Sequence, residues 1–214
     1  MSAAPPGLLS LVQWLSPVFP TGGFAYSHGL EWAISAGEVR DGASVERWLA
    51  DVLRFGAGRT DAILLAQALC ADADLGALTD IARALAPSAE RLRETEDQGA
   101  GFAAATAALT GLELAPRPLP VAVGQAARTL ALPVPQVLAL YLHAFAANLV
   151  SAAVRFVPLG QTEGQRVLAA LHPLIDALAL EAATATLDDL ATSALRADLA
   201  AMQHETMDVR IFRT

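Results

Sequence analysis

The sequence contains no lysine, one cysteine and few charged side chains. All 14 basic residues are arginines, which excludes from this chain any chemistry that needs a lysine amine, such as a Schiff base or the lysine of a nucleotide-binding P-loop. A nucleotide involved in its function must therefore be held by another protein. The single cysteine, Cys70, excludes an intrachain disulfide and a thiolate metal cluster. Its apolar run AILLAQALC predicts a small buried side chain.

The composition is apolar and acidic. Hydrophobic residues make up 54% of the 214 residues, charged residues 17%, and the mean hydropathy is +0.43. One domain core uses much of this apolar material, and the remainder predicts surface buried against a partner protein. Because a net charge of -8 repels phosphate backbones, nucleic-acid binding is not expected.

Nearly every segment favours helix. Apolar residues recur at three- and four-residue spacing, as in Val45, Trp48, Leu49 and Val52, and no convincing alternating strand is present. Helices are predicted over residues 7–15, 30–36, 45–70, 74–85, 88–112, 121–131, 135–157, 161–185 and 187–205. Residues 1–214 are therefore expected to form one all-α domain, a bundle of roughly eight to ten helices around a central buried apolar helix.

That central helix has two interpretations. Residues 136–154 carry no formal charge and are long enough to cross a bilayer. Polar residues such as Gln136, His143 and Asn148 interrupt the segment, and only Arg155 flanks it closely, so a core helix is favoured over a membrane span. The first residues have no basic region typical of a secretory signal. The expected location is the cytoplasm.

No catalytic arrangement is evident. The four histidines, at positions 28, 143, 172 and 204, form no i, i+4 pair with one another, and no metal site is predicted. The acidic group ETED at 94–97 is expected to be a solvated helix turn. One alternative stays open: a small helical metal-binding enzyme with an intersubunit site made from His28, Glu31 and His204.

The stretch FPTGGFAYSHGLE, residues 19–31, combines two glycines with aromatic side chains. Gly22 and Gly23 permit a sharp turn before the helix that begins near Leu30. Phe24 and Tyr26 then project from a turn rather than from a helix face. They either plug one end of the bundle or anchor an interface with another protein.

The C-terminal segment is unusual for a chain end. Residues 206–214 are expected to form a flexible tail, yet Val209, Ile211 and Phe212 are apolar and alternate with arginines. Apolar residues interleaved with arginine are typical of a segment that becomes ordered on a partner protein.

Four segments together resemble the urease accessory protein family called UreF. They are LVQWLSPVFPTGGFAYSHGLEWAISAG (11–37), PVAVGQAARTL (120–130), NLVSAAVRFVPLGQTEGQ (148–165) and the terminal MQHET…RIFRT (202–214). The matches run in order over most of the chain. The departures are small: residues 207–209 are less typical of the family, and Thr214 stands where serine is common.

The resemblance implies an all-helical homodimer without catalytic activity of its own. Proteins similar to this one bind UreD (also called UreH) and recruit the GTPase UreG, and the complex acts on apo-urease to support lysine carbamylation and nickel insertion. Nickel and GTP would be handled by the partner complex, so no cofactor of its own is expected and its nickel cation binding would be weak. A role in modulating GTP hydrolysis is also implied.

The residues expected to contact partners lie in the glycine stretch and the tail. They are Phe24, Tyr26, Glu31, Arg210, Ile211, Phe212 and Arg213. The tail is expected to order against UreD, with Phe24 near the same surface. Glu31 is a candidate for coupling to the GTPase, with a local ion pair as the competing interpretation.

Overall fold

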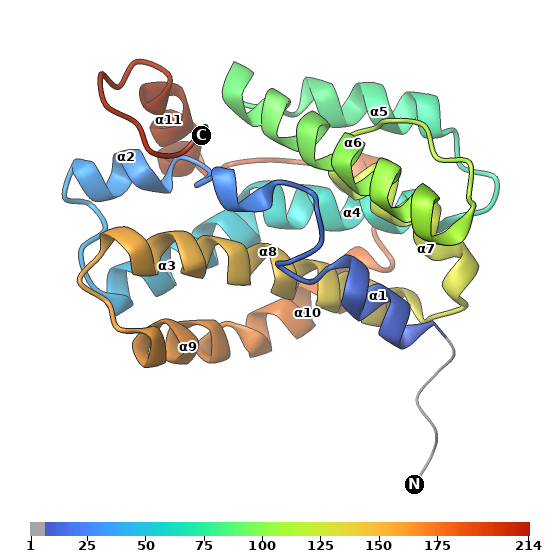
Figure 1. Cartoon of the computed structure of the whole chain (residues 1–214), viewed down its shortest axis with the longest axis horizontal. Helices are drawn as coiled ribbons and strands as arrows, with labels where there is room; N and C mark the ends of the chain where they lie inside the picture. Colours follow the sequence, from blue (N-terminus) through green and yellow to red (C-terminus); the bar gives the residue numbers. More distant parts are fainter. Residues whose placement is uncertain (1–6) are drawn as a thin grey trace, which may run out of the picture.

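The computed structural model describes residues 7–214, which form α-helices joined by short loops and three 3-10 turns (Figure 1). The elements are α1 (Leu8–Trp14), η1 (Gly23–Ala25), α2 (Leu30–Ser35), α3 (Gly42–Phe55), α4 (Ala57–Leu69), α5 (Leu75–Ala84), α6 (Ala89–Thr110), α7 (Leu119–Ala127), η2 (Arg128–Leu130), α8 (Val134–Phe156), α9 (Gln161–Ala170), α10 (His172–Ala182), η3 (Leu187–Asp189) and α11 (Leu195–His204). The all-α prediction is confirmed, since this part of the chain contains no strand.

The apolar helix α8 runs through the middle of the bundle (Figure 1). It packs against α10, α9, α4, α2 and α3. By length and composition it is one helix that could cross a membrane, yet half of its most apolar window is buried inside the protein. Its neighbours on several sides fit the predicted core helix of a bundle.

Two predicted long helices are each divided in two. The segment 45–70 breaks at Gly56, where the backbone leaves helical angles (φ -126°, ψ -143°) and lies against Ala194. The segment 161–185 breaks before His172, because Pro173 cannot donate the amide hydrogen bond that would continue the helix. The predicted last helix is shorter than expected: residues 187–189 form a 3-10 turn, and α11 begins only at Leu195.

Helix α3 begins at Gly42, three residues before the predicted start at residue 45. Asp41 is the capping residue, and its carboxylate accepts the Ser44 N–H at 2.8 Å. The Ser44 hydroxyl accepts the Asp41 N–H at 3.0 Å in return. This reciprocal pair is a capping box, which moves the helix start three residues earlier than the hydroxyl alone indicates.

The predicted burial of Cys70 is wrong. The residue is exposed and ends α4 in an extended conformation (φ -66°, ψ 134°). Helix α4 ends at Leu69, and the Cys70 thiol donates to the Ala66 carbonyl oxygen at 3.8 Å. The sequence pattern identified the helix correctly but not the residue at which it ends.

Small residues let the helices on one side of the bundle approach closely. A Cβ on Gly124 of α7 would lie 2.6 Å from the Cβ of Ala68 and 2.8 Å from the Leu65 carbonyl oxygen of α4. A Cβ on Gly99 of α6 would lie 1.8 Å from the Arg117 carbonyl oxygen. This side is stabilised by close packing of backbones, which leaves no space for a larger side chain at these glycines.

Candidate functional site

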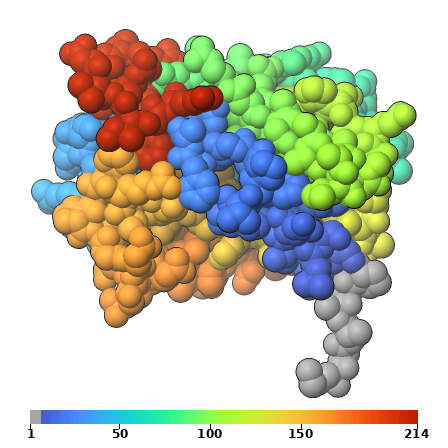
Figure 2. Space-filling model, viewed as in Figure 1, coloured from blue at the N-terminus to red at the C-terminus, as the bar shows by residue number. Residues whose placement is uncertain are grey.

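The glycine stretch and the C-terminal tail lie side by side at one end of the molecule. Figure 2 shows the red C-terminal segment resting on the blue residues near position 25. The Arg213 N–H donates to the Ala25 carbonyl oxygen at 2.7 Å, and the Ser27 N–H donates to the Thr214 carbonyl oxygen at 2.9 Å. Ser27 and Thr214 are 187 residues apart in the sequence, yet their segments form one surface.

The backbone around Gly29 explains how this meeting is possible. Gly22, His28 and Gly29 all have positive φ angles, of 77°, 58° and 75°. A Cβ on Gly29 would lie 2.7 Å from the Ala201 nitrogen of α11. Only glycine therefore allows the start of α2 to approach α11, the helix that leads into the tail.

The side-chain carboxylate of Glu31 binds the backbone of the tail. Its side chain is buried, with 4% exposed, and its Oε1 accepts the Ile211 N–H at 2.9 Å. Its Oε2 accepts the Phe212 N–H, also at 2.9 Å. A carboxylate that accepts two successive amides fixes the backbone of a segment without constraining its side chains.

Glu90 of α6 binds the same segment from the opposite side. Arg210 donates a hydrogen bond from its guanidinium to Glu90 Oε1. The fully buried His204 lies between the two carboxylates, with Nδ1 at 2.7 Å from Glu90 Oε2 and Nε2 at 3.0 Å from Glu31 Oε2. The tail is therefore anchored to α2, α6 and α11 at once.

Glu94 lies one turn further along α6 and binds the last residue. Its Oε2 accepts the Thr214 hydroxyl at 2.8 Å, and Arg91 forms an ion pair with it. Burial alone raises the pKa of Glu94, but the Arg91 charge and His28 outweigh burial and lower the pKa to about 2. Glu31, Glu90, Glu94, Arg91, His204 and Arg210 are together called the buried ionic cluster below.

His28 lies against this cluster, but its Nδ1 has no hydrogen-bond partner among residues 7–214. The nearest acid, Glu94, has its Oε1 at 3.9 Å from that nitrogen. Burial, with the Arg91 charge as a second cause, lowers the pKa of His28 to about 4. The ring is therefore neutral at pH 7.

The partner-facing residues predicted from the sequence divide into two groups. Tyr26, Glu31 and Phe212 are buried, and the Tyr26 hydroxyl donates to Asp97 Oδ2 at 2.8 Å. The others reach the surface: Phe24 is 44% exposed and Ile211 70%, and the Arg210 and Arg213 side chains are 41% and 68% exposed. The buried group supports the surface that the second group presents.

Phe24 and the tail are joined through Arg155 of α8. The Arg155 guanidinium lies 5.1 Å from the centre of the Phe24 ring and 5.9 Å from that of Phe212. Phe212 also packs on Phe156, with ring centres 5.1 Å apart. Cation–π contacts of this kind align the two aromatic residues along one strip.

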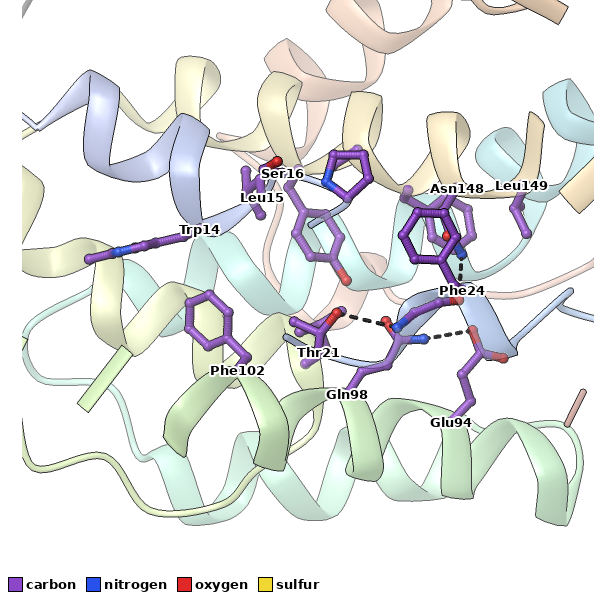
Figure 3. A pocket seen from close by; sticks show the side chains of 16 residues that line it. Trp14, Leu15, Ser16, Thr21, Phe24, Glu94, Gln98, Phe102, Asn148 and Leu149 are labelled. Carbon is purple, nitrogen blue, oxygen red and sulfur yellow. Dashed lines mark hydrogen bonds between the residues drawn. The ribbon is translucent and has the colours of Figure 1, made fainter. Parts of the chain in front are cut away.

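A cavity of about 90 Å³ lies below the glycine stretch, between α1, α6 and α8 (Figure 3). Its walls are mainly apolar, and Trp14, Phe102 and Phe24 are among them. Figure 3 shows two hydrogen bonds at its polar end: Asn148 Nδ2 donates to the Gly23 carbonyl oxygen at 3.0 Å, and Gln98 Nε2 donates to Glu94 Oε1 at 3.2 Å. The Asn148 contact thus holds the stretch over the cavity.

The sequence interpretation missed most of the buried ionic cluster, and the expectation of a solvated turn at 94–97 is wrong for Glu94, which is buried. A signal was present. Glu90 and Glu94 are one helical turn apart (i, i+4), so both acids lie on one face of α6, and both are buried.

A second missed pair joins α4 to α8. The Tyr141 hydroxyl donates to Asp61 Oδ2 at 2.8 Å in a partly buried position. Burial raises the pKa of Asp61 to about 6, against the lowering effect of the Tyr141 hydrogen bond. This pair links two core helices and does not reach the tail surface.

The arrangement of His28, Glu31 and His204 bears on the alternative metal site. His204 meets Glu31 within one chain rather than across subunits. Among residues 7–214, no group of three or more histidine, cysteine, aspartate or glutamate side chains is placed to hold a metal ion. Glu31 and His204 form part of a hydrogen-bonded ionic network, and His28 lies beside it.

Comparison with known proteins identifies the family. The UreF family model matches residues 39–172. The chain is 75% identical over 214 residues to "Urease accessory protein UreF" of Cereibacter sphaeroides strain KD131, covering all of both chains. The chain belongs to the UreF family. It is also 55% identical to the UreF proteins of Jannaschia sp. strain CCS1 (97% of this chain, 94% of the relative) and Dinoroseobacter shibae (96% and 98%).

Proposed function

We propose that this chain is a non-catalytic accessory protein in the maturation of nickel urease. The chain matches proteins named urease accessory protein over nearly their whole length. The site described above consists of exposed apolar and arginine side chains over a buried ionic cluster, which suits protein binding. In this role it bridges UreD (UreH) and the GTPase UreG, in the cytoplasm, and couples GTP hydrolysis to nickel insertion into apo-urease. Nickel and GTP belong to the partner complex.

One observation carries the proposal. Phe24 and Ile211, two exposed apolar side chains from opposite ends of the sequence, belong to segments that are hydrogen-bonded to each other and rest on the buried ionic cluster. Exposed aromatic and aliphatic side chains flanked by arginine, on a rigid base, are typical of an interface centre. We assign this surface, with Arg210 and Arg213 at its edge, to UreD.

Further exposed apolar side chains support the other contacts. Leu195, Leu199 and Met202 follow one another along the outer face of α11 and are 70%, 55% and 44% exposed. A stripe of this kind on a helix is typical of a helix that packs against another protein. We include homodimer formation and recruitment of UreG in the proposal. Analytical ultracentrifugation of the purified chain tests the homodimer, because it measures the mass of the particle in solution.

Surface variants test the UreD assignment more cleanly than a truncation. Deleting the tail removes the donors that satisfy Glu31, Glu90 and Glu94, so it disturbs the interior as well as the surface. Ile211→Ser changes a side chain that is 70% exposed, and Leu180→Ser on α10, which is 63% exposed, is the matched control. We expect Ile211→Ser to weaken co-purification with UreD at least tenfold and Leu180→Ser to leave it unchanged.

The accessory role itself is tested by activation of apo-urease. The purified partner proteins, nickel, bicarbonate and GTP are combined with and without this chain, and urease activity is measured. We expect activation to depend on the chain and to fall with Ile211→Ser. Equal activation without the chain contradicts the proposal, and so does turnover of a substrate by the isolated chain.

A further inference from the structure

His204 is in an unusual position for a buried histidine, because both of its ring nitrogens face carboxylates. Nδ1 lies 2.7 Å from Glu90 Oε2 and Nε2 lies 3.0 Å from Glu31 Oε2, with no part of the residue exposed. A neutral imidazole has one N–H donor and one acceptor nitrogen, whereas an ionised carboxylate only accepts. A neutral ring would therefore place two acceptors against each other at one of these contacts.

The extra proton does not belong to either carboxylate. Both oxygens of Glu31 accept backbone amides, from Ile211 and Phe212. Glu90 accepts the Arg210 guanidinium on Oε1, which leaves Oε2 for the ring. Each acid is thus bonded by donors that favour its ionised form.

The charges of the cluster lead to the same assignment. Three buried carboxylates, Glu31, Glu90 and Glu94, face two guanidinium groups, Arg91 and Arg210. A third cation reduces the uncompensated negative charge, and an uncompensated buried carboxylate is strongly unfavourable. His28 cannot supply it, since that ring is neutral at pH 7.

We propose that His204 is held as a doubly protonated imidazolium and that it is the positioning residue for the C-terminal tail. By donating to both Glu31 and Glu90, the ring fixes the two carboxylates at the spacing that receives Arg210, Ile211 and Phe212. The groups that face it directly are Glu31 from α2 and Glu90 from α6. The charged neighbours beyond them are Arg210 from the tail, Arg91 and Glu94 from α6, and Glu205, whose carboxylate accepts the Glu90 N–H.

Loss of one ring proton then acts on the tail. A neutral His204 leaves one carboxylate facing an acceptor nitrogen, and the cluster loses one positive charge. We expect the tail to detach when the ring loses its second proton, because one of the two carboxylates then loses its donor. The protonation state concerns the isolated chain. Only its effect on UreD capture rests on the proposed function.

Nuclear magnetic resonance of the full chain with ¹⁵N-labelled histidine tests the protonation state. The chain has four histidines, and His204→Gln assigns the signals that disappear. At pH 7 we expect both His204 ring nitrogens to carry protons. An unprotonated His204 nitrogen at pH 7, with the tail docked, overturns the inference.

Hydrogen exchange at the Ile211 and Phe212 amides tests the effect on the tail. We expect their protection to fall at least tenfold over the pH interval in which the His204 signals change. In Glu90→Gln the side-chain amide donates to Nδ1 while its oxygen accepts Arg210, so a neutral ring suffices and the pH dependence of protection should vanish. Glu96→Gln, which alters a surface ion pair with Arg83 on the same helix, is the matched control and should behave as the unmodified chain.

The two proposals fail separately. Protection that does not follow the His204 signals, or that keeps its pH dependence in Glu90→Gln, contradicts the role of His204 whatever UreD does. Normal His204 signals with no capture of UreD contradict the proposed function and leave the inference intact.

Discussion

The two sides of the bundle are stabilised by different physics. Where α4, α6 and α7 meet, glycine and alanine bring backbones together, and Gly99 and Gly124 leave no space for a larger side chain. Where the tail docks, ions and directional hydrogen bonds join α2, α6 and α11. The first side depends on shape, and shape does not change with pH. The second depends on charge, and its stability follows the protonation of a few side chains.

The largest expected effect comes from breaking the ionic side. Glu90→Ala removes the partner of both His204 and Arg210, and we expect the free energy of unfolding to fall by about 3–5 kcal/mol. Urea denaturation measures it. Glu46→Ala, an exposed acid on α3, is the control and should change stability by less than about 0.5 kcal/mol. A loss below about 1 kcal/mol for Glu90→Ala contradicts the structural importance of the cluster.

Adding one methyl group tests the closely packed side formed by α4, α6 and α7. In Gly99→Ala the new Cβ meets the Arg117 carbonyl oxygen at 1.8 Å, and because that atom is backbone we expect a loss of about 3 kcal/mol. Gly160→Ala is the control, since in the described part of the chain no atom lies within 4 Å of the added Cβ, and the φ of Gly160 is -70°. Equal stability of the two variants contradicts the close packing of α6 on the 116–120 segment. The loss for Gly99→Ala should be the same at pH 5 and pH 7.

Acid sharpens the contrast. Because burial lowers the pKa of His28 to about 4, the native state binds fewer protons than the unfolded chain between about pH 6.5 and pH 4. Stability is therefore expected to fall in that window as the pH is lowered, by on the order of 2–3 kcal/mol. His28→Asn tolerates the positive φ at this position and should remove that part of the slope.

Asp61 acts in the opposite direction. Its pKa of about 6 is raised by burial, so the native state binds more protons than the unfolded chain, and Asp61 favours folding more at pH 4 than at pH 7. The contribution of His28 to the pH dependence of stability must therefore be measured as the difference in slope between the unmodified chain and His28→Asn. A slope that is identical in both contradicts the neutral, buried His28.

The smallest expected effect on stability is at the presented surface. Phe24→Ala removes the cation–π contact with Arg155 at a half-exposed position, and we expect a loss of about 0.5–1 kcal/mol in thermal or urea unfolding. The same variant should weaken UreD binding far more than it weakens folding. If Phe24→Ala lowers the free energy of unfolding by more than it weakens the free energy of UreD binding, Phe24 has a structural role and the prediction is contradicted.

The sequence predicted the helices well because their signals are local. The apolar spacing of Val45, Trp48 and Val52 specifies a helix within one segment, and tertiary contacts only decided where it breaks, as at Gly56 against Ala194. The end of α4 was less predictable, because the exposure of Cys70 depends on the turn after Leu69.

The ionic cluster could not be predicted in this way. His204 is separated by 114 residues from Glu90 and by 173 from Glu31, so no local pattern reports their contact. Family resemblance singled out Glu31. The alternation of apolar residues with arginine singled out the tail, and Phe24 was singled out as a turn aromatic. The sequence provided no reason to expect that Glu31 holds the tail from within, because burial of an acid is a property of the assembled fold.

Hydroxyl-radical footprinting of the chain with and without UreD tests the central claim most directly. The rates of oxidation of Phe24, Val209 and Ile211 are compared with that of Leu180 on the distant helix α10, all four being exposed in the free chain. We predict that UreD protects the first three and leaves Leu180 unchanged. Protection of Leu180, with the glycine stretch and the tail still oxidised at their free rates, contradicts the account.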